Sequence, residues 1–164
     1  MATKAEGDNP APEAQLRSFI ESARFDPKDQ KLMGSVRTAV RKLFPAANEL
    51  AYNYNHAVVI AYSPSENGIE GVVSLSLLAE GVRLYFTNGP KLPDPKKLLQ
   101  GSAKMVRFIE VKSASDLAHP DVKALIAAAT DAATIPLPSK GKGSLIIKSD
   151  GTKARPRGKP KKKK

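Results

Sequence analysis

Two cations, Lys104 and Arg107, follow a Gly-Ser turn in the stretch LLQGSAKMVRFIEV, residues 98–111. Backbone N–H groups exposed at such a turn, together with the two cations, could form a site for a phosphate or a carboxylate. In a regular strand starting at Lys104 the two side chains would point to opposite faces, so they converge only if Lys104 lies in the turn. In the alternative interpretation Gly101 ends a short helical turn, and Arg107 pairs with a carboxylate on the sheet surface.

Tyr52, Tyr54 and His56 alternate with asparagines, which is the period of a β-strand and places the three rings on one face. They could line a pocket in which the imidazole acts as a base or as a ligand. The alternative is an edge strand whose aromatic rings pack and whose histidine is solvated. The second histidine, His119, precedes a proline and is expected to start a helix.

The sequence offers little for catalysis. It contains no cysteine, which excludes disulfides, thiol nucleophiles and thiolate-held metal centres. Neither the Gly-x-Ser-x-Gly pattern, the His-Glu-x-x-His pattern nor a Gly-x-x-x-x-Gly-Lys-Ser/Thr phosphate loop occurs. A site of paired carboxylates stays open. These observations favour binding over catalysis, with no cofactor and no metal.

The positive charge is concentrated at the C-terminal end. The chain carries a formal net charge of +11. Nine Lys/Arg against Asp150 alone give residues 148–164 a net charge of +8, which leaves +3 for the other 147 residues. We expect an unstructured polycation that binds nucleic acid or an acidic protein non-specifically by releasing counterions, or one that only increases solubility. The cations expected to contact a polyanion are Lys153, Arg155, Arg157, Lys159, Lys161, Lys162, Lys163 and Lys164.

Apolar periodicity divides the rest of the chain. Two helices are expected after a disordered segment of residues 1–11, the second starting at Asp26 and ending before Pro45. Strands of period two follow between residues 49 and 112, and a last helix starts at His119. This pattern predicts an α+β domain over residues 12–134, with two layers: an antiparallel sheet of four to five strands and helices on one face. Residues 135–147 are expected to be a linker with a short edge strand, and residues 148–164 a basic tail.

The alternation also predicts which residues the helices leave uncovered. In two neighbouring strands, Ser74, Ser76, Arg83 and Tyr85 fall on the face opposite the apolar residues. That face is free to meet solvent or a ligand. The predicted ligand-binding set is therefore Tyr54, His56, Arg83, Tyr85, Lys104 and Arg107. The N-terminal residues lack a secretory-type apolar core and no apolar run is long enough to span a membrane, so we expect a cytoplasmic protein without a membrane partner.

Several short stretches stand in one order along the chain: NYN at 53–55, LYF at 84–86, LPDP at 92–95, LLQGS at 98–102, Arg107, DVKALIAAA at 121–129, LIIKS at 145–149 and RPR at 155–157. Together they resemble the YdhG-like family of small domains of unknown function, over roughly residues 43–157. Members of this family often have a second glycine where this chain has Ala103, so the turn at Gly101 is expected to differ.

The resemblance implies a fold similar to that of frataxin. Two functions stay open, of which the first follows from the polar sheet face and the basic tail and the second from the resemblance. The first is a non-catalytic binding module for an anionic small molecule or a protein partner, with a tail able to bind nucleic acid. The alternative is an iron chaperone, for which oxygen ligands would be needed. The carboxylates that would serve in this second case are Glu13, Glu21 and Glu49.

Overall fold

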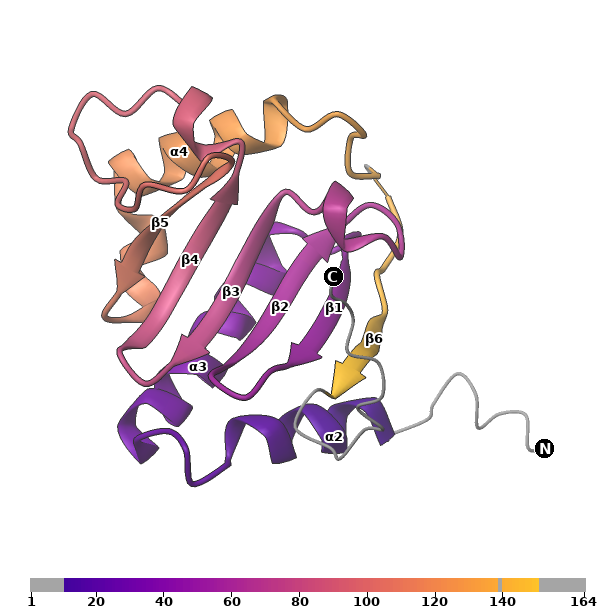
Figure 1. The fold of residues 1–164 in the computed structure, drawn as a ribbon. Coiled ribbons are helices and arrows are strands. Elements are labelled where there is room, and N and C mark those ends of the chain that lie inside the picture. The colour runs from indigo at the N-terminus through magenta and orange to yellow at the C-terminus, as the bar shows by residue number, and fades with distance from the viewer. Residues whose placement is uncertain (1–10, 139, 151–164) are drawn as a thin grey trace, which may run out of the picture.

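The computed structural model describes residues 11–138 and 140–150. Within these ranges the chain forms three α-helices and six β-strands (Figure 1). The helices are α2 (Ala11–Ile20), α3 (Pro27–Leu43) and α4 (Pro120–Asp131). The strands are β1 (Asn48–Asn53), β2 (Ala57–Ser63), β3 (Val73–Leu78), β4 (Gly81–Thr87), β5 (Val106–Val111) and β6 (Leu145–Asp150). Residues 1–10 of the predicted N-terminal segment and the predicted polyanion-binding cations lie outside the described residues, whereas Ala11, which was expected in that segment, is the first residue of α2.

The boundaries of α3 follow from local chemistry, as the sequence predicts. The side chain of Asp26 accepts a hydrogen bond of 2.8 Å from the backbone N–H of Lys28, and Pro27 occupies the first turn. Such a cap satisfies a backbone donor that has no partner inside the helix. The helix ends at Leu43, shortly before Pro45. It buries Met33, Val36 and Val40 against the sheet.

The sheet has six strands in the order β5-β4-β3-β2-β1-β6. The first five are antiparallel to their neighbours, but β6 lies parallel to β1. The expected antiparallel sheet of four to five strands is therefore wrong in strand number and in the orientation of its last strand. The reason is the connection after α4, which carries the chain from the β4–β5 side to the opposite edge, where β6 enters beside the start of β1 (Figure 1).

Because β6 extends to Asp150, residues 148–150 belong to the sheet rather than to the predicted tail. The strand is attached at its start by a close backbone approach at Gly143. The Gly143 N–H donates to the carbonyl of Pro45 over 3.0 Å, and the Glu49 N–H donates to the carbonyl of Ser144 over 2.8 Å. A Cβ atom on Gly143 would lie 1.7 Å from the carbonyl oxygen of Ala47. Only glycine fits at this position.

The helices cover one face of the sheet. In Figure 1, α3 and α4 lie behind the strands and α2 runs beneath their lower ends. The core residues of the strands alternate along each strand and include Ala51, Val58, Ile60, Tyr62, Val73, Leu75, Leu77, Val82, Leu84, Phe86, Ile109 and Val111. We call the opposite side the open face; the register places on it Leu50, Tyr52, Val59, Ala61, Ser74, Ser76, Arg83, Tyr85, Phe108 and Glu110. None of the helices in the described ranges is both long and apolar enough to cross a membrane.

Replacement of Gly143 by alanine should detach β6 from β1. The added methyl group would collide with the Ala47 carbonyl, and we expect a loss of roughly 1–3 kcal/mol in the free energy of unfolding, as for other overpacked sites. Urea denaturation measures this loss, and hydrogen exchange of the β1 and β6 amides locates it. Gly34→Ala is the control, because nothing lies within 4 Å of a Cβ there and alanine favours a helix interior. Equal stability of the two variants would contradict the prediction.

Candidate functional site

Three rings form a stack at one end of β1. Tyr52 lies in β1, whereas Tyr54 and His56 belong to the tight turn that leads into β2, closed by a 2.8 Å bond from the Tyr54 N–H to the Ala57 carbonyl. The rings of Tyr52 and Tyr54 are 5.9 Å apart with an interplanar angle of 3°, and those of Tyr54 and His56 are 6.1 Å apart at 21°. The structure therefore brings the three rings together as the alternation predicts, although the strand ends before the last two. We call them the aromatic stack.

Arg24 holds this turn in place. Its guanidinium, from the loop between α2 and α3, donates to the carbonyl of Tyr54 over 2.5 Å and to the side-chain oxygen of Asn53 over 2.8 Å. A charged donor with several acceptors fixes backbone geometry more firmly than a neutral one. The turn is thus anchored to the helical layer, and the aromatic stack keeps its position. No spacing in the sequence points to Arg24.

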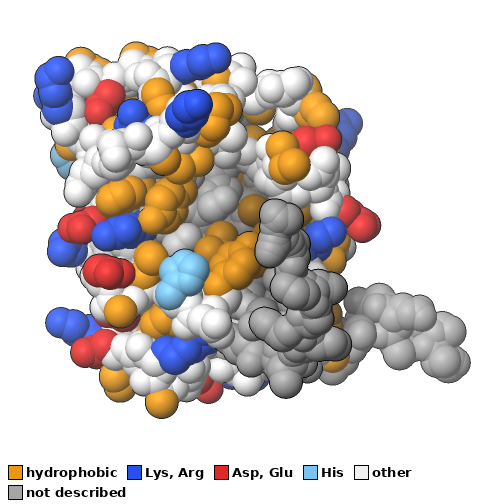
Figure 2. Space-filling model, in the orientation of Figure 1, with side chains coloured by type: hydrophobic (Ala, Val, Ile, Leu, Met, Phe, Trp, Pro, Cys, Tyr) orange, Lys and Arg blue, Asp and Glu red, His pale blue; other side chains and the backbone are white. Residues whose placement is uncertain are grey.

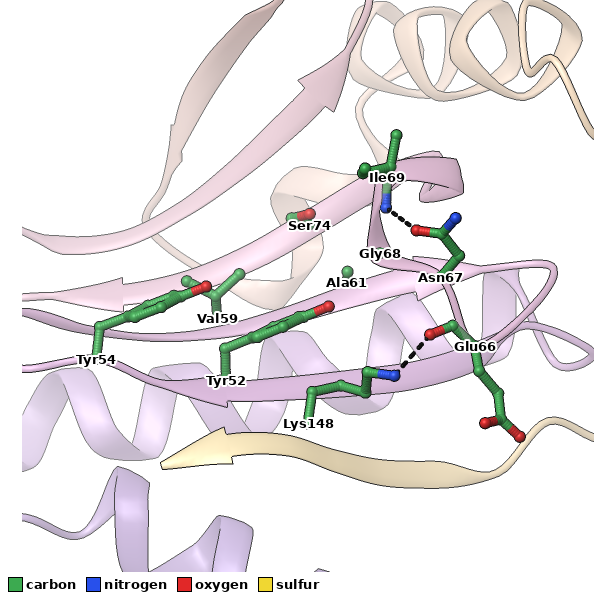
Figure 3. A pocket seen from close by; sticks show the side chains of 10 residues that line it. All are labelled: Tyr52, Tyr54, Val59, Ala61, Glu66, Asn67, Gly68, Ile69, Ser74 and Lys148. Atoms are coloured by element: carbon green, nitrogen blue, oxygen red, sulfur yellow. Dashed lines mark hydrogen bonds between the residues drawn. The ribbon is translucent and has the colours of Figure 1, made fainter. Parts of the chain in front are cut away.

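The aromatic stack borders a hollow of about 620 Å³ on the open face. Small side chains of β2 and β3, namely Val59, Ala61 and Ser74, form its floor, and the loop of residues 66–69 closes one end. Figure 3 shows the Tyr52 and Tyr54 rings tilted in the same direction along β1, with the Tyr52 hydroxyl near this loop. A Cβ on Gly68 would lie 2.3 Å from that hydroxyl oxygen, so glycine is what allows the ring its place.

The rim of the hollow combines a cation with exposed apolar surface. Lys148, in β6, donates from its Nζ to the backbone carbonyl of Glu66 over 2.9 Å (Figure 3). Ile69 is 87% exposed and Tyr54 is 40% exposed. Burial raises the pKa of the Tyr52 phenol, and the neighbouring Tyr54 adds to this rise. The phenol therefore stays protonated and remains a hydrogen-bond donor at neutral pH.

A second aromatic group lies across the open face on β4 and β5. The guanidinium of Arg83 stands 4.2 Å from the ring centroid of Phe108, and Tyr85 lies 5.2 Å from the same ring. Arg83 also donates to the Tyr85 hydroxyl over 3.3 Å. Among the described residues no carboxylate lies within 4 Å of the Arg83 guanidinium, and its buried Nε has no hydrogen-bond partner there. Arg83 and Tyr85 were expected on this face, but Phe108 was not singled out.

Arg107 and Lys104 do not join either group. Arg107 has the parity of Ile109 and Val111, which point into the core, so it lies on the opposite side of β5 from Phe108. Its guanidinium turns back to donate to the carbonyls of Ala103 and Val106. Lys104 is exposed in the segment that precedes β5. Because Arg107 points away from the open face and Lys104 lies before β5, the six predicted ligand-binding residues do not form a single site. In the turn before β5, Gly101 adopts a φ of +106°, and Ala103 does not share this conformation.

A space-filling view shows the surface of the open face. Figure 2 shows hydrophobic side chains gathered over the strands around a hollow, with charged side chains of both signs, Lys and Arg as well as Asp and Glu, at the margins. The second histidine lies elsewhere: His119 caps α4, accepting from the Asp121 N–H over 3.2 Å. The expectation that it starts the last helix is confirmed.

Two of the three carboxylates considered for iron, Glu13 and Glu49, bind one arginine. Arg37, on α3, donates to both oxygens of Glu13 at 3.0 Å and to both oxygens of Glu49 at 2.7 and 2.9 Å. The hydroxyl of the buried Tyr62 donates to Glu49 over 2.8 Å. Glu49 is only 3% exposed. We call these four residues the Arg37 cluster.

A metal ion would have to displace Arg37 to reach Glu13 and Glu49 together. Within residues 11–138 and 140–150, no group of three or more His, Cys, Asp or Glu side chains is arranged to hold a metal ion. Glu21 follows the end of α2 and makes no ion pair with another described residue. The geometry of these carboxylates therefore gives the iron alternative no support.

Burial and the charges within the Arg37 cluster shift the pKa values of three of its members. The hydrogen bond from Arg37 is the largest cause that holds the pKa of Glu13 below its usual value. Burial, and after it the charge of Glu49, raise the pKa of Tyr62 well above the usual range. Burial alone would lower the pKa of Arg37, but the hydrogen bonds and charges of Glu49 and Glu13 outweigh it and raise that pKa. Arg37 is thus charged at every accessible pH.

A scan of protein-family models, a search of curated proteins and a search of solved structures each find no match to this chain.

Replacement of Arg37 by methionine should cost about 3–5 kcal/mol of the free energy of unfolding, because Glu49 would be left buried without its main partner. Arg41→Met is the control. Arg41 lies 3.5 Å from Glu49 but its side chain is 46% exposed, so its loss should cost at most about 1 kcal/mol. Guanidinium denaturation measures both variants, and similar losses for the two would contradict the role assigned to Arg37.

The Glu13→Gln variant should show a weaker decrease in the free energy of unfolding as the pH falls below neutral. Because the pKa of Glu13 is lowered in the folded state, its contribution is fully present above the usual glutamate pKa and is lost as the pH falls through the lower, folded value. The contribution at neutral pH is at most about 1 kcal/mol, since the side chain is 46% exposed. Thermal melts between pH 3 and pH 7 test this, with Glu21→Gln as the control. An unchanged pH profile for Glu13→Gln would contradict the assignment.

Proposed function

We propose that this protein is a non-catalytic binding module that takes an anionic ligand or an anionic protein surface on the open face of its sheet. In this proposal the chain is a YdhG-like domain with a frataxin-like fold, it acts in the cytoplasm, and its basic C-terminal residues add non-specific attraction for polyanions. Arg83 and Tyr85 contact the ligand from one side, and the aromatic stack contacts it from the other.

The observation that carries the proposal is Arg83. A surface arginine usually pairs with a carboxylate or extends into solvent. Here the guanidinium is held over Phe108 at 4.2 Å, and no carboxylate of a described residue lies within ion-pair distance. Glu110 is the cross-strand neighbour of Arg83 on β5, but it does not form an ion pair with the guanidinium. A cation that is already held in place and partly buried has little conformational freedom left to lose when an anion binds. The planar guanidinium also suits the two oxygens of a phosphate or carboxylate.

Substitution Arg83→Gln should weaken anion binding about tenfold or more, since hydrogen bonds to charged groups contribute about 1.5–3 kcal/mol. The probe is inorganic tripolyphosphate, titrated into the full-length chain and followed by the amide NMR shifts of β4 and β5. Resolved amides separate binding at the open face from attraction by residues 151–164.

Lys123→Gln is the matched control, because Lys123 is exposed on α4, in the helical layer. It should leave the titration unchanged. Shifts confined to residues beyond Asp150, or equal affinity of the Arg83→Gln variant and the natural chain, would overturn the proposal.

A further inference from the structure

We propose that the ligand of the open face is single-stranded nucleic acid, whose bases stack on the exposed rings while its phosphates meet the surrounding cations. This inference rests on the proposed function and specifies its ligand. Five observations on the described residues carry it: the placement of the rings, the row that joins them, the shallow floor, the charge, and the point at which the basic residues leave the sheet.

The rings lie at two separate places on one surface. Tyr54 and His56 end the aromatic stack in the turn between β1 and β2, next to the edge strand β6, and Phe108 with Tyr85 lies near the β5 edge. Base–aromatic stacking contributes about 1–3 kcal/mol per base and tolerates any sequence, because every base has a π-face. Two separated groups suit a chain of linked bases better than one small planar ligand, which would occupy only one of them.

One row of paired residues joins the two groups. The register places Tyr52 opposite Val59, Val59 opposite Ser76, and Ser76 opposite Arg83. β1 and β4 are three strand spacings apart, or about 14 Å at roughly 4.8 Å per spacing. A single strand with at least about 3.4 Å per nucleotide crosses this distance with at most about four nucleotides. That length matches the lower end of the site sizes of single-strand-binding folds, about four nucleotides.

The hollow beside the aromatic stack leaves room for the start of such a chain, and Ser74 on its floor is the cross-strand neighbour of Tyr85 in the second group. The side chains of Val59, Ala61 and Ser74 line the hollow of about 620 Å³ and are small. A strand surface that carried large side chains here would fill the space. Ser74 and the Tyr52 phenol, which stays protonated because its pKa is raised, supply hydrogen-bonding groups beside the apolar surface. Ile69 adds an apolar side chain that is 87% exposed at the rim.

The net positive charge of the chain favours a polyanionic partner over a neutral one. Arg83 and Lys148 lie on or beside the open face, and the carboxylates Glu110 and Glu66 lie there too. The positive charge available to a polyanion therefore comes mainly from the rest of the chain, since the whole chain has a net charge of +11. Residues 151–164 contain eight Lys/Arg and neither Asp nor Glu. They follow β6 directly, and the register places Asp150 opposite Asn53, next to Tyr54. The parallel pairing of β6 thus starts the basic segment beside the aromatic stack, where the phosphates of a bound strand would continue.

The test is fluorescence anisotropy with the full-length chain and a labelled 12-nucleotide DNA strand. Three competitors accompany it: the matching duplex, an abasic strand of equal length, and inorganic polyphosphate. We expect the single strand to bind at least about fivefold more tightly than the abasic strand, because the abasic strand lacks the stacking of its bases. Binding should weaken as salt rises, as expected for counterion release.

Tyr54→Leu and Phe108→Leu should each weaken binding of the single strand by about fivefold or more and leave polyphosphate binding unchanged. Leu43→Ala is the control variant, since Leu43 is 42% exposed at the end of α3 rather than on the open face. Circular dichroism confirms that each variant is folded. For a variant that does not fold, the abasic strand and the natural chain still decide the question.

The outcomes separate this inference from the proposed function. Equal binding of single strand, duplex and abasic strand, with no effect of the ring variants, would show attraction by charge alone and overturn the inference. If tripolyphosphate still binds through Arg83 in that case, the proposed function stands. If neither tripolyphosphate nor the DNA strand shifts the amides of the open face, both fail.

Discussion

The ion pair between Arg37 and Glu49 determines which way β1 faces. Side chains alternate along a strand, so an inward Glu49 requires Tyr52 to point outward. A slip of one residue would bring the tyrosine ring toward α3 and expose the carboxylate. The apolar residues of β1 specify this register weakly, because Leu50 and Ala51 are both buried and lie on opposite faces. A buried carboxylate that finds Arg37 and Tyr62 in one register only therefore selects the exposed aromatic face.

The open face can remain uncovered because the other side of the sheet supplies the core. Antiparallel sheets tolerate one solvated face when the other packs against helices. The burial of β4 alternates residue by residue along the strand, with Leu84 and Phe86 inside and Arg83 and Tyr85 partly exposed. Partial exposure lets each outward ring contact a neighbour and still present surface to a ligand. The same alternation thus buries the core side chains and exposes the groups of the proposed binding surface.

The sequence predicted those features of the fold that depend on residues close to one another in the chain. The cap of α3 at Asp26, the outward faces of β3 and β4 and the helix start at His119 depend on residues a few positions apart, and the structure confirms them. Long-range pairings were not predictable in this way. The β6 edge depends on contacts such as that between Ser144 and Asn48, 96 residues apart. Arg107 was grouped with Arg83 by charge, whereas strand parity places the two on opposite sides of the sheet.

The parallel pairing of the last strand with β1, which the sequence does not predict, determines where the basic C-terminal residues begin. An antiparallel strand added to the β5 edge would release them beside Phe108, and an unpaired segment would give them no fixed starting point. The parallel pairing with β1 instead brings Lys148 to the rim of the hollow and ends the strand next to Tyr54. Cations that start beside exposed rings act at a high effective concentration for any anion held on those rings. Gly143 makes this arrangement possible, because its hydrogen atom is what allows β6 to approach the Ala47 carbonyl. The proposed binding surface and the basic segment are therefore linked through the pairing of β6 with β1, which begins at the close approach of Gly143 to the Ala47 carbonyl.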